Sequence, residues 1–493
     1  MSSAVKVVEP VPAKGSAWWP PGFGFFRLTC AAVAARWRRM HLASAYTSNM
    51  ALTFVVNVSI AALGLITGPM VARLLGPGGR GELAAIQYWP TFLVSAVSIG
   101  VPEALVYYCS KDPQRAGRYL GSALTMVLAL MAPVLAAAYL LMPVLLHAQP
   151  WHVIAAARWY LLMAPVFVLT FFPLHTLRSR PSLLAWNALR IPLNIGWLMV
   201  LIFAYLWKAR SAEWLARNYL IVQVLLILPV LVGVISLLRS RLKLDPQVVS
   251  PLVRYGFPTA GARWSQLLRH QCDRLIIAAY LGPAALGFYA VALAWGAATA
   301  PFINAVVSVT FSRLAAEADE RNAFAALARA ARVTLALCFV GGIMLALAAP
   351  LALPKLFGAA FREAVLPAAI LALAVSIIGA YAVLADGLRA RGKVKLVLHC
   401  ELLGLALGIA GIFLVVRKFG VPGIAFSVFF SYAVSHLVLA INAARLTGTP
   451  VTSFLVLQRR DIADLRASLT AWLRASGSAE SGSATPVNAP QAS

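Results

Sequence analysis

Apolar residues dominate this chain in long runs, which are separated by short polar and basic segments. A run of about 20 apolar residues crosses a bilayer as an α-helix, and such runs recur from residue 50 to residue 444. The pattern predicts an all-α polytopic membrane protein with about twelve transmembrane helices. We expect them at 50–75, 82–108, 117–146, 153–177, 182–207, 214–238, 254–281, 286–312, 326–353, 363–388, 394–416 and 421–444.

The composition agrees with this class. Hydrophobic residues make up 61% of the 493 residues and charged residues only 12%, whereas soluble domains carry about a quarter charged residues. The net charge of +26 would suggest a nucleic-acid partner in a soluble protein. Here the basic residues lie mostly between apolar runs, so we expect contact with anionic membrane lipids and no nucleic acid. The five cysteines are scattered without a CxxC pair, so no metal site is predicted.

The distribution of Lys and Arg predicts the orientation. If the N-terminus is cytoplasmic, the inside segments hold 28 of the 42 basic residues and the outside loops hold nine. Because cytoplasmic segments carry the excess of basic residues, both termini are expected to be cytoplasmic. The remaining five arginines lie within predicted spans: Arg158, Arg190, Arg263, Arg269 and Arg274.

Hydropathy and composition divide the chain into five segments. We expect a partly interfacial cytoplasmic N-terminal arm (1–48), an N-terminal six-helix lobe (49–240), a C-terminal six-helix lobe (241–446), an amphipathic cytoplasmic helix (447–475) and a disordered tail (476–493). No connecting loop exceeds about twenty residues, and no segment carries a P-loop or an HExxH motif. Nothing in the chain suggests covalent chemistry, so we predict no enzyme activity and no catalytic residues.

Two short motifs recur in register. "LLGPGGRGELAA" begins at Leu74 and "YLGPAALGFYAV" at Tyr280, and both contain L-G-P-x-x-x-G. A second pair, "LRSRPS" from Leu177 and "LRARGK" from Leu388, is offset by 211 residues, close to the 206 of the first pair. These two repeated motifs indicate that the halves of the chain arose by duplication. The two lobes should therefore be related by a pseudo-twofold axis along the membrane normal, with substrate between them.

The order of "ARLLGPGGRGELA", "DRLIIAAYLGPAALGFYAVA" and "LRARGK" within twelve helices resembles the polysaccharide flippase branch of the multidrug/oligosaccharidyl-lipid/polysaccharide exporter superfamily. The resemblance implies alternating access in a bacterial inner membrane for polysaccharide biosynthesis. It implies that an undecaprenyl-diphosphate-linked oligosaccharide moves from the cytoplasmic to the periplasmic leaflet. A polysaccharide polymerase and glycosyltransferases are the protein partners that it suggests.

Two other functions stay open. Cation-coupled drug or metabolite exporters of this fold usually carry an acid in the first helix, whereas the first apolar run here has Asn57, Ser59 and Thr67 but no acid. A membrane scaffold for polysaccharide assembly enzymes is the third hypothesis, and it would not need charges inside its spans.

Three arginines inside one span carry the functional hypothesis. A charge at the centre of a spanning helix costs about 2.5–3.5 kcal/mol on insertion scales, so each needs a reason. Arg263, Gln266, His270 and Arg274 fall within an arc of about 80° on a helical wheel. Arg269, a further candidate for binding substrate, lies on another face, one turn from Asp273, with which it can pair.

We expect this cationic stripe to bind the diphosphate of the substrate, because guanidinium groups bind phosphate oxygens with bidentate hydrogen bonds. Arg158 and Arg190 in the other lobe are the facing candidates, and Asn187 and Asn194 are candidate sugar contacts or helix–helix contacts. The competing interpretation is that the arginines pair with acids on other helices.

Four acids lie in or near the spans: Glu103, Asp273, Asp386 and Glu401. They are also the candidates for ion coupling, because a buried carboxyl can carry a proton during transport. No cofactor is predicted, and a proton or sodium gradient is the candidate energy source.

Overall fold

The computed structural model describes residues 45–98, 100–238, 240–299, 303, 319–461 and 463. The chain forms two units, residues 1–52 and residues 53–493, and the helical bundle belongs almost wholly to the second unit. The predicted arm over 1–48 and the predicted tail over 476–493 lie almost wholly outside the described residues.

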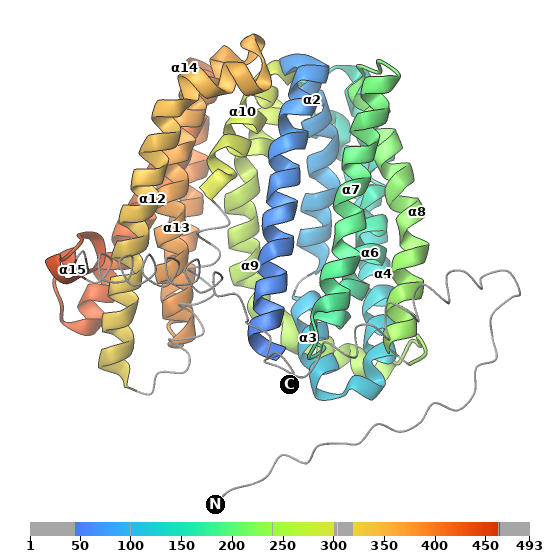
Figure 1. Cartoon of the computed structure of the whole chain (residues 1–493), viewed down its shortest axis with the longest axis horizontal. Helices are drawn as coiled ribbons and strands as arrows, with labels where there is room; N and C mark the ends of the chain where they lie inside the picture. Colours follow the sequence, from blue (N-terminus) through green and yellow to red (C-terminus); the bar gives the residue numbers. More distant parts are fainter. Residues whose placement is uncertain are drawn as a thin grey trace, which may run out of the picture. The chain divides into compact units, whose positions relative to one another are not determined.

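The described residues of this bundle are organised as α-helices, with three short 3-10 turns (Figure 1). The helices are α2 (Ala45–Ser98), α3 (Val101–Lys111), α4 (Ala116–Leu145), α5 (Trp151–Tyr160), α6 (Met163–Arg178), α7 (Leu184–Leu206), α8 (Ala212–Leu238), α9 (Pro246–Tyr280), α10 (Pro283–Gly296), α12 (Glu320–Phe357), α13 (Val365–Ala390), α14 (Val394–Thr447) and α15 (Thr452–Leu455). Among them, eight segments are long and apolar enough to cross a membrane, and α10 is a shorter apolar helix.

Two of these helices are long enough for two spans: α14 contains two predicted spans, and α2 contains one and most of the next. Helices α2 and α14 have 54 residues each, which would extend about 80 Å if straight, against a hydrocarbon core of about 30 Å. Each folds at a glycine with non-helical dihedral angles, Gly76 (φ 68°) and Gly420 (φ 54°). Both glycines adopt a positive φ that L-residues rarely adopt, and a proline follows shortly after each. Counted with these folds, the helices account for the twelve predicted segments, the eighth only as far as Thr299.

Two predicted spans are interrupted. The run 82–108 breaks between α2 and α3, where Gly100 is left-handed and Pro102 cannot donate to the Ser98 carbonyl. The run 153–177 breaks between α5 and α6 beside Leu161, whose carbonyl would require an N–H from Pro165.

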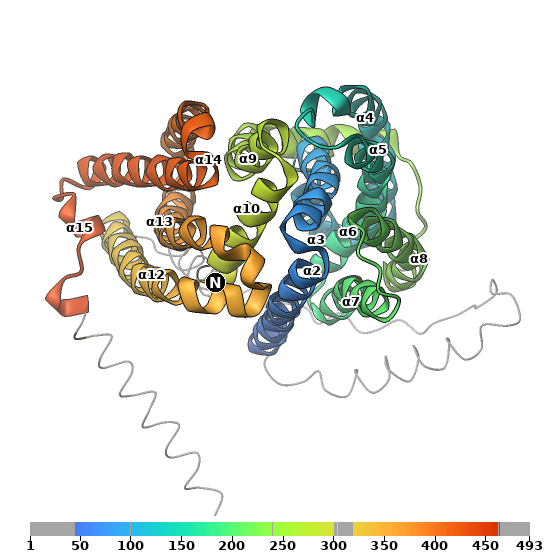
Figure 2. The same cartoon turned by 90° about the horizontal axis from the view of Figure 1, so that it is seen from above.

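The apolar core connects the two halves of the chain. One buried cluster is built from α2 to α9 and another from α12 to α15. The largest cluster takes residues from both halves, including Leu83 and Ile86 of α2 with Leu286 and Tyr289 of α10. Seen from above, α2 to α8 gather on one side and α12 to α14 on the other, with α9 and α10 between them (Figure 2).

The two L-G-P-x-x-x-G motifs pack against each other in this shared cluster. A Cβ atom on Gly81 would lie 1.7 Å from the carbonyl oxygen of Pro283, and one on Gly287 would lie 2.0 Å from that of Pro77. Each motif therefore places its last glycine on the proline of the other. This reciprocal contact is what a pseudo-twofold relation between two duplicated halves requires.

Polar contacts reinforce this end of the interface between the halves. Gln149, which follows α4, is 5% exposed and donates to the carbonyl oxygens of Ala278 and Leu281 at 2.9 and 3.0 Å. Arg73 of α2 donates to the Leu356 carbonyl at 2.8 Å, at the C-terminal end of α12 where such carbonyls lack helical partners.

After α14 the chain returns to the beginning of α12. Phe454 of α15 is buried, and Asp461 accepts hydrogen bonds from Arg332 of α12 at 2.5 and 2.8 Å. The predicted helix over 447–475 is described only to residue 463. There it consists of the one-turn α15, a non-helical stretch and helical residues from 459, instead of one continuous helix.

Candidate functional site

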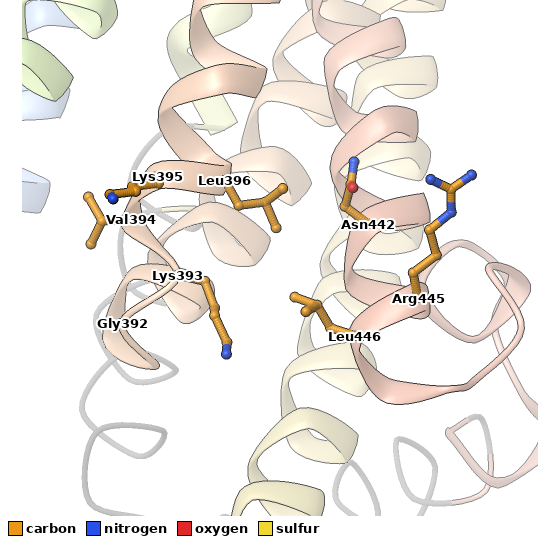
Figure 3. Close-up of a pocket in the computed structure, with 8 residues that line it drawn as sticks. All are labelled: Gly392, Lys393, Val394, Lys395, Leu396, Asn442, Arg445 and Leu446. Carbon is orange, nitrogen blue, oxygen red and sulfur yellow. The ribbon is translucent and has the colours of Figure 1, made fainter.

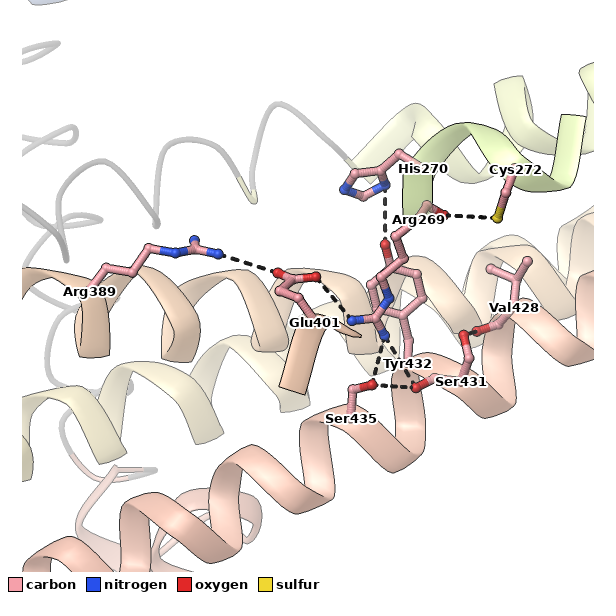
Figure 4. A network of polar contacts seen from close by, with 9 residues as sticks. All are labelled: Arg269, His270, Cys272, Arg389, Glu401, Val428, Ser431, Tyr432 and Ser435. Carbon is pink, nitrogen blue, oxygen red and sulfur yellow. Dashed lines mark hydrogen bonds and ion pairs between the residues drawn. The ribbon is translucent and has the colours of Figure 1, made fainter. Parts of the chain in front are cut away.

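Arg269 of α9 lies at the centre of a buried polar network in the second half (Figure 4). Its side chain is 3% exposed, and Nη1 lies 3.3 Å from Oε2 of Glu401 in α14. Nη2 donates to the Ser431 carbonyl at 3.2 Å and to the Ser435 hydroxyl at 3.0 Å. The guanidinium also lies over the ring of Tyr432, 3.7 Å from its centroid. Both Nη atoms of Arg269 therefore have partners inside the protein, whereas its buried Nε has none.

The network continues to two further charged groups. Oε1 of Glu401 lies 3.3 Å from Arg389 of α13, and Arg389 also pairs with Asp386 one turn before it. Two arginines and two acids thus alternate, which balances charge where burial of a lone ion is costly. Sequence spacing favoured Asp273 as the partner of Arg269, but the partner that the structure provides is Glu401.

Gly404 makes the Arg269 position possible. A Cβ atom there would lie 2.4 Å from the Arg269 guanidinium carbon and 2.4 Å from the Ser435 hydroxyl. Sequence analysis missed Arg389, Gly404, Tyr432 and the serines as members of this network. The available signals were the GxxxG spacing of Gly404 and Gly408, and the serines at Ser431 and Ser435 that face it.

Asp273 lies one turn after Arg269 on α9, but its carboxylate accepts hydrogen bonds from other groups. It is 5% exposed and accepts hydrogen bonds from the Tyr289 hydroxyl of α10 and from the Arg274 backbone N–H, the latter at 2.7 Å. Among the side chains that the structure describes, no cation lies within ion-pair distance of its carboxylate.

Arg274 differs from Arg269 in its partners. Its Nη1 donates to Gln271 at 2.9 Å, and its guanidinium lies 5.3 Å from the ring centroid of Tyr88 in α2. Its Nε is buried without a hydrogen-bond partner, as the Nε of Arg269 is, and no described carboxylate lies within ion-pair distance. Arg274 is therefore a half-buried cation that contacts the first half of the chain, and the neighbouring Asp273 interacts with it electrostatically without forming an ion pair.

Arg190 of α7 also has polar neighbours and no ion pair with a described carboxylate. It donates to Asn57 of α2 at 3.0 Å and to Asn187 at 3.5 Å, and it lies over the Trp186 ring at 4.3 Å. The described carboxylates are again beyond ion-pair distance. Asn187 is buried and donates to Thr53 of α2 at 3.0 Å.

The other predicted site residues are placed differently. Arg158 donates to the Tyr139 carbonyl at 3.1 Å and lies near the rings of Tyr139 and Trp151, both largely exposed. These contacts lie within α4 and α5, and none of them reaches the α9 arginines. Asn194 donates to the Arg190 carbonyl at 2.9 Å, a contact within α7.

On α9, His270 contacts the Tyr432 hydroxyl through Nδ1 at 3.2 Å, beside the Arg269 network. Gln266 is half-buried on the same helix. The backbone of Arg263 belongs to α9, and its side chain lies outside what the structure describes. Glu103 lies in the first turn of α3, away from the network around Glu401.

Comparisons with known proteins agree with this architecture. The model of a family described as "Polysaccharide biosynthesis protein" matches residues 46–316, more than half of the chain. No curated protein sequence matches the chain significantly.

Solved structures of transporters share the fold. Lipid II flippase MurJ in an inward closed conformation superposes with a TM-score of 0.65 at 14% identity, over 82% of this chain and 89% of that chain. An inward-facing multidrug resistance MATE family transporter of the MOP superfamily superposes with a TM-score of 0.62 at 15% identity, over 80% of this chain and 99% of that chain. At these identities the likeness shows the fold alone.

Proposed function

Since the chain belongs to the polysaccharide biosynthesis protein family, we propose that it is a flippase for undecaprenyl-diphosphate-linked oligosaccharide. In this proposal the lipid-linked sugar moves from the cytoplasmic to the periplasmic leaflet of a bacterial inner membrane by alternating access. The protein is a multi-pass membrane transporter by family and fold, and it is not an enzyme.

The observation that carries the proposal is the contrast among the arginines of α9. Arg269 is balanced by Glu401, whereas Arg274 has no described carboxylate within ion-pair distance and lies beside Tyr88 of the other half. A guanidinium held this way keeps donors available for phosphate oxygens, and binding of an anion would offset its cost in the membrane.

Arg190 is the second cation that we assign to the substrate. It contacts α2 through Asn57, and Arg274 contacts α2 through Tyr88, so one folded helix carries neighbours of both. Distributed cations suit transport, because the diphosphate must be released as well as bound. Asn187 beside Arg190 supports a polar path for sugar hydroxyls.

The alternative is a cation-coupled multidrug or metabolite exporter, which the MATE-like fold supports. The charges weigh against it. Asp386 and Glu401 are engaged by arginines, and the first segment of α2 has no acid to bind a coupling cation. A scaffold function is disfavoured because it gives no reason for Arg190 and Arg274.

One experiment separates these functions. The purified chain is placed in vesicles, and the inner-leaflet fraction of a labelled polyprenyl-diphosphate oligosaccharide is followed beside efflux of a cationic dye. A flippase accelerates movement of the labelled lipid and leaves the dye gradient unchanged. Dye efflux driven by a proton or sodium gradient, without lipid movement, would support the exporter. If the folded protein shows neither activity, the scaffold function is the one that remains.

A further inference from the structure

A cavity of about 600 Å³ lies apart from the arginines of the spans, at one end of α14 (Figure 3). Because α14 folds at Gly420, the start of its first segment and the end of its second come back to the same level. The cavity lies between them and is lined by Gly392, Lys393, Val394, Lys395, Leu396, Asn442, Arg445 and Leu446. We call this cavity the α14 pocket.

The pocket collects positive charge without negative charge. Three cationic residues line it, Lys393, Lys395 and Arg445, and no acid does. Within the described chain, none of the three makes an ion pair with a carboxylate. Two other basic residues of this half are paired with acids: Arg389 with Asp386 and Glu401, and Arg332 with Asp461. Three cations around one cavity repel one another, and a bound anion would offset this repulsion.

The backbone conformation determines the direction of the Lys393 side chain. Gly392 adopts a left-handed φ of 75°, and the Lys393 N–H then donates to the Leu388 carbonyl at 2.9 Å. This turn directs the Lys393 side chain into the gap between the two segments, as Figure 3 shows. Lys395 and Arg445 leave from the two flanks, and their long exposed side chains can turn toward the same gap.

The pocket also has an apolar rim. Val394 is 45% exposed and Leu446 is 49% exposed, and both line the cavity beside the cations. A soluble phosphate would gain nothing from these side chains. A lipid gains from both, because its phosphate meets the cations while the start of its tails covers the apolar rim.

The duplicated half of the chain has no lysines at the corresponding positions. With the offset of 211 residues that relates "LRSRPS" to "LRARGK", Lys393 corresponds to Ser182 and Lys395 to Leu184. The first half also joins two helices here, α6 and α7, without either cation, although its turn is longer and has Pro181 where the second half has Gly392. Lysines at these positions are therefore particular to the second half, which favours a role in binding a ligand.

We propose that the α14 pocket binds the phosphate of an anionic lipid at the membrane surface. Two lipids present that chemistry, a bilayer phospholipid such as phosphatidylglycerol and a polyprenyl diphosphate. The site does not depend on the transport activity proposed above, since binding is measured without turnover.

The test measures lipid binding to the purified full chain by native mass spectrometry, with phosphatidylglycerol, phosphatidylcholine and polyprenyl diphosphate titrated separately. A variant with Lys393→Ser, Lys395→Gln and Arg445→Gln should weaken binding of the anionic lipid by at least about tenfold. Phosphatidylcholine binding should not change. The matched control is Arg417→Gln with Lys418→Gln. These two exposed cations lie in the same helix, just before it folds at Gly420.

Each outcome of this binding experiment supports or overturns the proposal. A loss confined to phosphatidylglycerol assigns the pocket to bilayer lipid, and a loss confined to polyprenyl diphosphate assigns it to that lipid. Unchanged affinity for both by a folded triple variant would overturn the proposal, as would an equal loss in the control variant. If the triple variant unfolds, Lys393→Ser alone is decisive, because it leaves Gly392, whose left-handed conformation sets the turn, unchanged.

Discussion

Gly81 and Gly287 pack backbone against backbone where the two halves of the chain meet. They occupy the same position in the two L-G-P-x-x-x-G motifs. A Cβ on Gly81 would lie 2.8 Å from the Gly287 nitrogen, and one on Gly287 would lie 3.1 Å from the Gly81 nitrogen. No side chain fits at either position without moving backbone, so these glycines hold this end of the interface closed. In an alternating-access cycle this is a contact that must open and reform.

Replacing Gly81 or Gly287 by alanine should prevent the halves from closing here. Overpacking of this kind costs about 1–3 kcal/mol, which shifts the closed state by roughly 5- to 150-fold. We expect normal insertion, strongly reduced export of lipid-linked sugar and increased labelling of cysteines near the contact. The control is Gly78→Ala, because a Cβ there meets nothing within 4 Å and the other motif already has Ala284. Full export by both alanine variants would contradict the opening and closing of this contact.

The helices were predictable because apolar run length and a 3.6-residue period are local properties of the sequence. The sequence predicted loops between spans at Gly76 and Gly420, and it did not predict that each helix would continue through a bend at the glycine. The partner of Arg269 was not predictable, because Glu401 is 132 residues away and α9 offers Asp273 one turn along. Gly404 belongs to a GxxxG spacing that indicates close packing against another group. In the structure that group is the Arg269 guanidinium, which the spacing alone cannot identify.

The Arg269–Glu401 pair predicts a stability effect. Arg269→Ala leaves a carboxylate that is 3% exposed without one of its partners, and breaking a buried pair in this way costs about 3–5 kcal/mol. We expect a lower melting temperature and lower abundance in membranes. Combining Arg269→Gln with Glu401→Gln should restore much of the abundance, because no uncompensated charge remains. If Arg269→Ala accumulates like the wild type, the pair does not stabilise the fold.

The Arg332–Asp461 pair predicts how pH affects the segment after α14. The hydrogen bonds from Arg332 hold the pKa of Asp461 below its ordinary value. The stabilisation is therefore present above the unfolded pKa of about 3.9 and is lost as pH falls through the lower folded value. Proteolysis of residues 450–461 in the purified protein should stay slow from pH 7 to about pH 4 and accelerate below.

Asp461→Asn should loosen this segment at every pH in that range. Asp112→Asn is the control. It removes the same charge, but from a pair with Arg115 at an exposed site. Equal proteolysis of the wild type and Asp461→Asn at neutral pH would show that the pair does not hold the segment.

The orientation is tested with single cysteines in a cysteine-free background. Arg210 is exposed between α7 and α8, and Gln114 is exposed between α3 and α4. Cytoplasmic termini require that an impermeant thiol reagent labels Arg210→Cys in intact cells and Gln114→Cys only after permeabilisation. The reverse pattern would invert the topology. Gln149 is unsuitable for this test because it is buried against the end of α9.

The last prediction concerns Arg274 and Arg190, which we assign to the diphosphate. Neither side chain forms an ion pair with a described carboxylate, so alanine breaks no ion pair, and both variants should insert at normal abundance, unlike Arg269→Ala. Loss of a charge-assisted contact of about 1.5–3 kcal/mol should reduce export of lipid-linked sugar by roughly 10- to 150-fold. Arg274→Lys should keep part of the activity, because the charge remains while the bidentate geometry is lost. Arg158→Ala is the matched control, since that arginine also lies in a span but contacts exposed aromatic rings. Export is measured in a flippase-deleted host beside the amount of protein in membranes. If Arg274→Ala and Arg190→Ala export at wild-type rates and normal abundance, these cations do not bind the substrate, and the cationic path between the halves is refuted.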